Sequence, residues 1–183
     1  MNSYHKIVIL GVLLLFSCQA LFADELSGIS NYREYSPYFS SSGQPTEKQL
    51  KLLSDAGFKR IVYIAFSDNK NAMASEDRVV KSLGMDYSQI PVDYDKPTMA
   101  DFEDFAALLN RDKQYRTLLH CQINYRASVF SFLYRVIYAG VAVDVAKTDL
   151  DSVWQPSEIW HQLIIDVLTH HGMSEQASIL FGT

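Results

Sequence analysis

The chain has 183 residues, of which 48% are hydrophobic, so it is long enough for one ordinary hydrophobic core and short for two. Only 8 residues are glycine and 5 are proline, which excludes collagen-like and low-complexity chains. Sixteen basic residues against 21 acidic ones give a formal net charge of −5. The sequence has no run of Lys or Arg that could follow the phosphate backbone of a nucleic acid, so we expect no nucleic-acid partner.

The N-terminus has the layout of a secretory signal peptide. Lys6 precedes an apolar run at 7–16, and small residues follow as far as Ala23. The run is shorter than the roughly 20 residues that span a bilayer, so we expect no transmembrane span. Residues 1–23 are therefore predicted to be removed on export, to the periplasm of a bacterium. The alternative is a lipid anchor on Cys18, because the residues before it resemble a lipoprotein box.

The remaining chain contains a single cysteine. Without the signal peptide, Cys121 has no partner for an internal disulfide. An unpaired thiol in an oxidising compartment is either buried and inert or kept for its chemistry. The residues around Cys121 decide between these two interpretations.

Helices alternate with strands along the chain. We expect residues 24–45 to form an extended lead-in and 46–183 to form a single domain. A capping box at Thr46 and Gln49 and a stop at Gly57 delimit the first helix. Helices are predicted at 47–56, 75–83, 98–109, 127–139, 144–150 and 157–170, and strands at 60–66, 87–92 and 116–120. This order predicts an α/β fold in three layers, with a short, mostly parallel central sheet flanked by helices.

The stretch around Cys121 carries the chemistry. Cys121 stands at the end of a buried strand and one short loop before a helix. Backbone N–H groups converge at such a position and the helix dipole is positive, so both favour a thiolate. Arg126 adds a fixed charge and a planar fork that can hold two oxygens of a tetrahedral anion. The loop therefore combines an activated nucleophile with an anion site.

Residues 120–128 resemble the phosphate loop of cysteine-dependent tyrosine and dual-specificity phosphatases. Over residues 42–172 the chain looks more closely like a small bacterial phosphatase-like family, which is also found beside beta-lactamase-like hydrolase domains. The matching segments are Ser42–Pro45, Ala56–Phe58, Ile90–Asp93, His120–Ser128, Leu133–Arg135 and Val153–Trp154. The resemblance implies a tyrosine- or dual-specificity-phosphatase-like fold, a phosphorylated protein or small molecule as substrate, hydrolysis through a phosphocysteine, and no cofactor.

The resemblance also implies roles for individual residues. Cys121 would be the nucleophile, and the phosphate would be held by the Arg126 side chain and by the backbone amides of Gln122, Ile123, Asn124, Tyr125 and Arg126. The leaving oxygen needs a proton donor. Asp93 matches the family position for this donor better than Asp95, which stays the alternative. His120 is expected to be buried and hydrogen-bonded, to orient the loop, and to point away from the Cys121 side chain because side chains alternate along a strand.

The loop departs from the wider phosphatase pattern in three respects. Four residues separate Cys121 from Arg126, where that pattern has five. Asn124 replaces a glycine, so we expect it to adopt a left-handed conformation. Ala127 stands where a hydroxyl residue normally follows the Arg, and Ser128, one position later, is the candidate substitute.

Two other functions fit the same loop. A cysteine, four residues and an arginine also occur in many rhodanese-like sulfurtransferases, in which Cys121 would carry a persulfide. The loop would equally suit a non-catalytic module that binds phosphate or sulfate on a partner. We expect no metal site, because His161, His170 and His171 lack companion ligands at metal spacing. The sequence leaves the physiological substrate and the oligomeric state open.

Overall fold

A computed structural model describes residues 25–181, so the predicted signal peptide and Cys18 lie outside the described residues. The described chain forms a five-stranded sheet in the order β1-β2-β5-β3-β4. Four strands are parallel, and β1 pairs antiparallel with β2 at one edge. The strands are Arg33–Ser36 (β1), Phe39–Ser42 (β2), Arg60–Tyr63 (β3), Asp86–Gln89 (β4) and Thr117–His120 (β5). The predicted mostly parallel sheet is confirmed.

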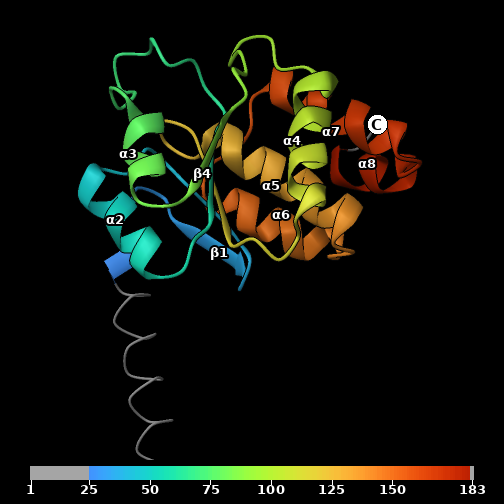
Figure 1. Cartoon of the computed structure of the whole chain (residues 1–183). Helices are drawn as coiled ribbons and strands as arrows, with labels where there is room; N and C mark the ends of the chain where they lie inside the picture. The colour runs from blue at the N-terminus through green and yellow to red at the C-terminus, as the bar shows by residue number, and fades with distance from the viewer. Residues whose placement is uncertain (1–24, 182–183) are drawn as a thin grey trace, which may run out of the picture.

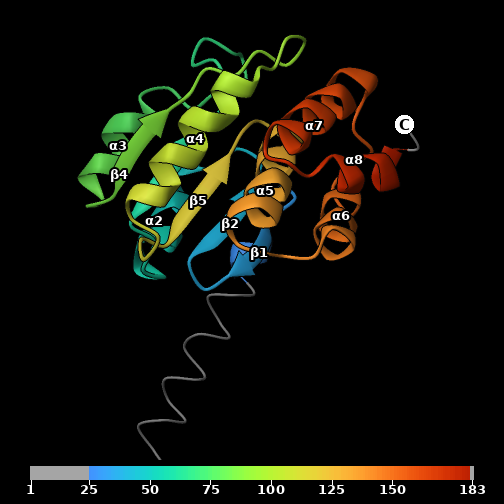
Figure 2. The same cartoon turned by 90° about the vertical axis from the view of Figure 1, so that its right-hand side faces the viewer.

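Helices flank the sheet on both faces, which confirms the three layers (Figure 1). Helices α2 and α3 cover one face, and α4 and α5 cover the other. Helices α6, α7 and α8 lie beside α5, at the far side from β4 (Figure 2). The bounds are Glu47–Asp55 (α2), Glu76–Ser82 (α3), Met99–Arg111 (α4), Tyr125–Tyr138 (α5), Val143–Asp151 (α6), Glu158–His170 (α7) and Ser174–Phe181 (α8).

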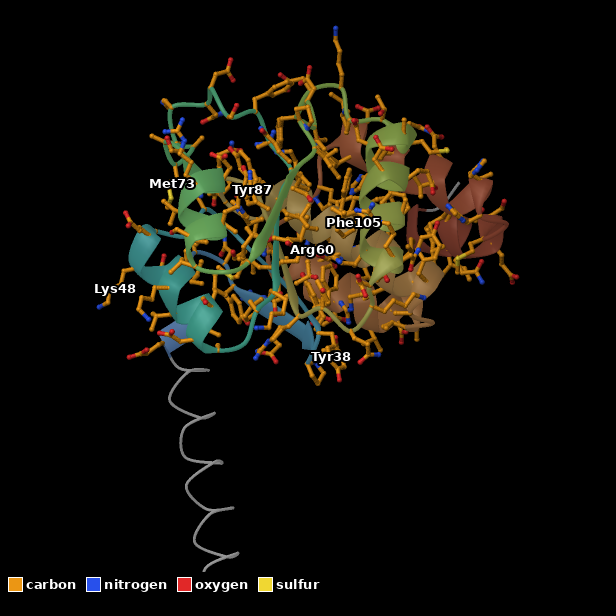
Figure 3. All side chains as sticks on the ribbon, in the orientation of Figure 1. Tyr38, Lys48, Arg60, Met73, Tyr87 and Phe105 are labelled. Carbon is orange, nitrogen blue, oxygen red and sulfur yellow. The ribbon has the colours of Figure 1, made fainter. Side chains whose placement is uncertain are left out.

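Alternate side chains of the central strands enter two different hydrophobic clusters. Ile61 and Leu118 pack on the side of α2 and α3. Val62 and Leu119 pack on the other side, in one cluster with Phe105 of α4. Phe105 is labelled in Figure 3. This division follows from the two-residue period of a strand. It accounts for the absence of polar alternation in these strands, because both of their faces are covered.

Most local signals in the sequence are confirmed. Thr46 Oγ1 accepts a hydrogen bond from the N–H of Gln49 at 3.3 Å, and the Gln49 side chain accepts one from the N–H of Thr46 at 2.9 Å, which is the predicted capping box of α2. Thr98 and Asp101 form the same arrangement at the start of α4. The strands β3 and β4 are shorter than predicted, and α8 has no predicted counterpart. Within 25–181, no helix has the length and hydrophobicity that crossing a membrane requires.

The segment 24–45 differs from its description as a lead-in. It supplies β1 and β2, and β2 lies between β1 and β5 with every residue buried. The hydroxyl of Tyr32 bonds to Ser40 Oγ at 3.1 Å, and that of Tyr35 bonds to Ser41 Oγ at 2.8 Å. Because these tyrosines satisfy the hydroxyl groups, a polar run can occupy a buried strand. A run of serines alone has the composition of a loop, which explains the wrong prediction.

Candidate active site

Cys121 lies at the carboxyl edge of the sheet, as the sequence predicts. Strand β5 ends at His120, Cys121 follows directly, and α5 begins at Tyr125. The side chain of Cys121 is buried and unpaired. The start of α5 therefore points its unsatisfied N–H groups toward the loop that Cys121 opens.

One open pocket of about 400 Å³ gathers the principal candidates. Cys121, Arg126 and Asp93 all line it, although Asp93 is 28 residues from Cys121 in the sequence. The other lining residues are Phe66, Asn69, Asn71, Tyr94, Gln122, Ile123 and Tyr125. The candidate nucleophile, the cation and the candidate acid that the sequence indicates thus share one cavity.

Asn124 adopts the predicted left-handed conformation, with φ of 72°. It is fully buried and stands at the N-cap position of α5, where its carbonyl accepts the N–H of Ser128 at 2.8 Å. Asparagine tolerates positive φ better than most residues, so it can replace the usual loop glycine. The shortened loop therefore closes onto the helix without a glycine.

Arg126 connects the loop to the segment that carries Asp93. Its guanidinium is buried, and Nη1 donates to the carbonyl of Val92 at 2.9 Å. The guanidinium carbon also lies 5.9 Å from the ring centroid of Tyr94. Among residues 25–181 the side chain makes no other hydrogen bond. A guanidinium has five N–H donors, so the remaining ones are available to bind an anion.

The two candidate acids have different surroundings. Asp93 is partly exposed and lines the pocket, and its Oδ1 accepts the N–H of Asp95 at 2.9 Å. That bond forms an Asx-type turn, which orients the Asp93 carboxylate. Asp95 is exposed and does not line the pocket. The geometry favours Asp93, the residue that the resemblance also favours.

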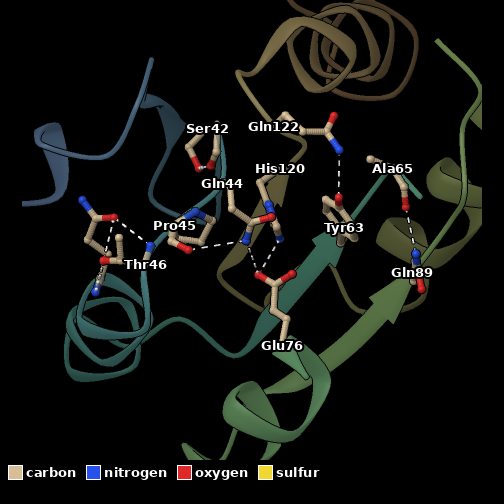
Figure 4. Close-up of polar contacts among 12 residues, drawn as sticks. Ser42, Gln44, Pro45, Thr46, Tyr63, Ala65, Glu76, Gln89, His120 and Gln122 are labelled. Atoms are coloured by element: carbon tan, nitrogen blue, oxygen red, sulfur yellow. Dashed lines mark hydrogen bonds and ion pairs between the residues drawn. The ribbon is translucent and has the colours of Figure 1, made fainter. Parts of the chain in front are cut away.

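His120 points to the face opposite Cys121, in agreement with strand alternation. It is fully buried on the side of α3, as expected, but the expected hydrogen bond is absent among the described residues. Nε2 lies 3.1 Å from Oε1 of Glu76, at an angle that does not make a hydrogen bond (Figure 4). Its ring stacks on Tyr63, with centroids 4.8 Å apart. Glu76 also accepts a hydrogen bond from Nε2 of Gln44 at 2.9 Å. These buried contacts connect α3 to β5 and to the segment that follows β2.

Several supporting residues escape sequence reasoning. The side chain of Gln122 donates to the hydroxyl of Tyr63 at 2.9 Å (Figure 4). That hydroxyl donates in turn to the carbonyl of Phe66 at 3.1 Å. Burial raises the pKa of Tyr63 to about 12. Glu76 reads in sequence as an ordinary acid in the first turn of a helix, so nothing there marks it as a partner of His120.

The Ser-Gly-Gln segment has a structural explanation. A Cβ atom on Gly43 would lie 2.8 Å from the carbonyl oxygen of Gln122 and 3.1 Å from the Cα atom of Ile123, so only glycine fits. The backbone N–H of Gln44 donates to that same Gln122 carbonyl at 3.0 Å. The match of Ser42–Pro45 to the family is therefore the sequence signal that this segment supports the outer side of the loop.

Ser128 does not line the pocket. Its hydroxyl donates to the carbonyl of Tyr125 at 2.9 Å and accepts from Nε1 of Trp154 at 3.2 Å. The rings of Tyr125 and Trp154 are stacked, with centroids 4.4 Å apart and planes inclined by 2°. Ser128 thus holds the helix against Trp154.

In the described part of the chain, no group of three or more His, Cys, Asp or Glu residues is arranged to hold a metal ion.

A five-stranded mixed sheet between helices, with the sequence Cys-loop-Arg between a strand and a helix, defines the tyrosine- and dual-specificity-phosphatase class of fold. A family model described as "DSP-PTPase phosphatase fused to NAD+ Kinase" matches residues 25–159. The chain belongs to this family of cysteine-dependent phosphatases. No curated protein sequence matches the chain.

Solved structures agree with this assignment. A DUF442 protein of Shewanella putrefaciens CN-32 is 32% identical, with a TM-score of 0.74, over 81% of this chain and 97% of that one. TpbA of P. aeruginosa, in complex with phosphotyrosine, is 16% identical with a TM-score of 0.62, over 79% and 90%. PTPMT1 in complex with PI(5)P is 11% identical with a TM-score of 0.66, over 77% and 96%. The last two are similar in fold.

Proposed function

We propose that this protein hydrolyses phosphate monoesters through a phosphocysteine on Cys121. The thiolate sulfur attacks phosphorus, the P–O ester bond breaks, and Asp93 gives its proton to the leaving oxygen. Water then attacks the phosphocysteine and passes a proton back to Asp93. The S–P bond breaks, inorganic phosphate leaves, and the thiolate is restored. The loop amides and Arg126 stabilise the charge on the equatorial oxygens in both steps.

One observation carries this proposal: Cys121, Arg126 and Asp93 line the same pocket, at the N-terminus of α5. The thiol alone would fit an inert core residue, and the arginine alone would fit an anion-binding module. A carboxylate in the same cavity adds the proton donor that ester hydrolysis needs. The combination therefore favours turnover over binding.

The surroundings of the pocket support an aryl phosphate as test substrate. Phe66, Tyr94 and Ile123 line it and are among the exposed large hydrophobic residues of the chain. Flat apolar groups pack favourably against such a rim. The phosphotyrosine bound to TpbA gives the same indication for a phosphorylated substrate.

Phosphate release from an aryl phosphate tests the proposal. The wild type should release phosphate, vanadate should inhibit it, and Cys121→Ser should abolish it. Activity that survives Cys121→Ser would contradict the mechanism. Mass spectrometry of the protein quenched in mid-turnover should show a phosphoryl group on Cys121. An added sulfur atom would instead identify a sulfurtransferase, and equal anion affinity of both variants without turnover would identify a binding module.

We also propose that the enzyme acts after export, as the pattern of residues 1–23 indicates. The mass of the protein recovered from the periplasm tests this. Cleavage after Ala20 or Ala23 is the expected result, and a lipidated Cys18 would identify a membrane-anchored form. Full-length protein confined to the cytoplasm would contradict the proposal.

A further inference from the structure

Two backbone carbonyls of the loop after Cys121 are held on its outer side. The carbonyl of Gln122 accepts the backbone N–H of Gln44 at 3.0 Å. The next carbonyl, that of Ile123, accepts Nδ2 of Asn31 at 3.0 Å. Asn31 is thus the only side chain among residues 25–181 that donates to either carbonyl.

The first of these bonds determines where the N–H of Ile123 points, and the second holds the same part of the loop from outside. In a planar trans peptide the C=O of one residue and the N–H of the next lie on opposite sides, and the described chain has no cis peptide bond. The N–H of Ile123, a residue that lines the pocket, therefore points away from residue 44 and toward the side of Cys121 and Arg126. Ile123 also pairs with Gly43 in an antiparallel bridge, so the Asn31 bond holds the outer edge of the loop in place beside this amide. A bound oxyanion requires donors with this orientation.

The side chain of Asn124 is held by the same neighbour. Asparagine at an N-cap normally accepts hydrogen bonds from the first turn of its helix, where those N–H groups would otherwise bind an anion. Asn124 makes no such capping bond, and its Nδ2 donates instead to the backbone carbonyl of Asn31 at 2.7 Å. The first N–H groups of α5 are thereby left free.

Asn31 is suited to this double contact by its own conformation. It has φ of 49°, a left-handed value that asparagine tolerates. The preceding carbonyl, that of Ser30, accepts the N–H of Gly43 at 2.7 Å, which seats this segment against the loop. Residue 31 therefore presents a donor and an acceptor to two consecutive residues, Ile123 and Asn124.

We propose that Asn31 is a positioning residue of the active site, which anchors the outer edge of the shortened phosphate loop beside the Ile123 amide and keeps the Asn124 side chain from capping α5. We call the reciprocal contact of Asn31 with Ile123 and Asn124 the asparagine clamp. The clamp acts from outside the loop, through one hydrogen bond to Ile123 and one from Asn124. The inference rests on the proposed function for its catalytic consequence, and on anion binding for its test.

Calorimetric binding of tungstate, a tetrahedral oxyanion without a leaving group, tests the clamp directly. Asn31→Gly keeps the positive φ and the carbonyl but removes the donor to Ile123. It should weaken tungstate binding on the order of tenfold, the loss expected for about one hydrogen bond. Ser75→Gly is the matched control, because Ser75 also has a positive φ, 57°, and makes no side-chain capping bond. It should bind tungstate as the wild type does.

A double-variant cycle gives the second readout. Asn124→Gly keeps the positive φ and removes the bond that seats residue 31 against the loop. Because that bond acts on anion affinity through the position of the Asn31 side chain, the double variant should lose little more affinity than the weaker-binding single variant. Thermal unfolding of each variant shows that the folded protein is compared throughout. Unchanged tungstate affinity in Asn31→Gly, an equal loss in Ser75→Gly, or fully additive losses would each overturn the clamp. Tungstate binding that depends on Asn31, in a protein that hydrolyses no aryl phosphate, would refute the proposed function and leave the clamp intact.

Discussion

Arg126 donates a hydrogen bond from Nη1 to the carbonyl of Val92, at 2.9 Å, and so joins the loop after Cys121 to the residue directly before Asp93. The two elements of the proposed mechanism are therefore in contact before any substrate binds. A phosphate that engages the guanidinium would act on the same side chain that holds the Asp93 segment. The proposed acid and the proposed anion site are therefore connected through one hydrogen bond of Arg126.

Replacing this arginine with lysine should impair catalysis while the charge stays. Arg126→Lys loses the planar fork and the pairing of two oxygens, so kcat/KM for an aryl phosphate should fall about 100-fold. Arg135→Lys is the matched control, because Arg135 is also buried on α5 but pairs with Asp149 at 2.7 Å, outside the pocket. Equal activities of the two variants would contradict the role of Arg126.

Substitution of Asp93 and of Asp95 should differ in how the loss of rate depends on the leaving group. Asp93→Asn should lower kcat by about 100-fold for a phenyl phosphate with a basic leaving group, and by much less for one with an acidic leaving group that needs no protonation. Asp95→Asn should change both rates by no more than a few-fold, since Asp95 does not line the pocket. A larger loss in Asp95→Asn would transfer the role of acid to that residue.

The buried contact beneath the loop should matter for stability. Glu76→Ala removes the partner of His120 and of Gln44, so the free energy of unfolding should fall by about 3 kcal/mol in urea denaturation. Asp77→Ala, the next residue on α3, breaks only an exposed pair with Lys81 and should lower it by less than about 1 kcal/mol. A similar small loss in both would show that the Glu76 contact contributes little.

The Tyr63 hydroxyl should ionise at a higher pH than that of an ordinary tyrosine. Burial raises its pKa from 10.0 to about 12, so the neutral hydroxyl is favoured by the fold. The stability that this provides is complete below pH 10 and is lost as the pH rises through about 12. Ultraviolet titration of tyrosinate in the wild type and in Tyr63→Phe checks this. The ionisation step missing from Tyr63→Phe should lie near pH 12, and a missing step near pH 10 would contradict the burial effect.

Much of the architecture follows from local sequence. The capping residues of α2 and α4, the apolar strands β3 and β5, and the Cys121 loop before α5 all lie where spacing and residue type predict them. Such signals are readable because capping, periodicity and the chemistry of one loop involve residues within a few positions of each other. The left-handed Asn124 belongs to the same group.

Contacts between distant segments are a different matter. The buried serines of β2 resemble a loop until Tyr32 and Tyr35 are placed beside them. The pairing of Glu76 with His120 joins residues 44 positions apart, and no sequence pattern around either residue predicts it. Asn31 lies still farther from Ile123 and supports it through one side-chain amide.

The amino-acid order alone determined the class of fold and the candidate nucleophile with its arginine, because strand and helix periodicity and a single short loop encode them. Only the tertiary structure decided that Asp93, and not Asp95, lines the pocket, and which distant residues hold the loop in shape. Those outcomes depend on how whole elements pack across the sheet, and packing sums many weak contacts that no local pattern contains.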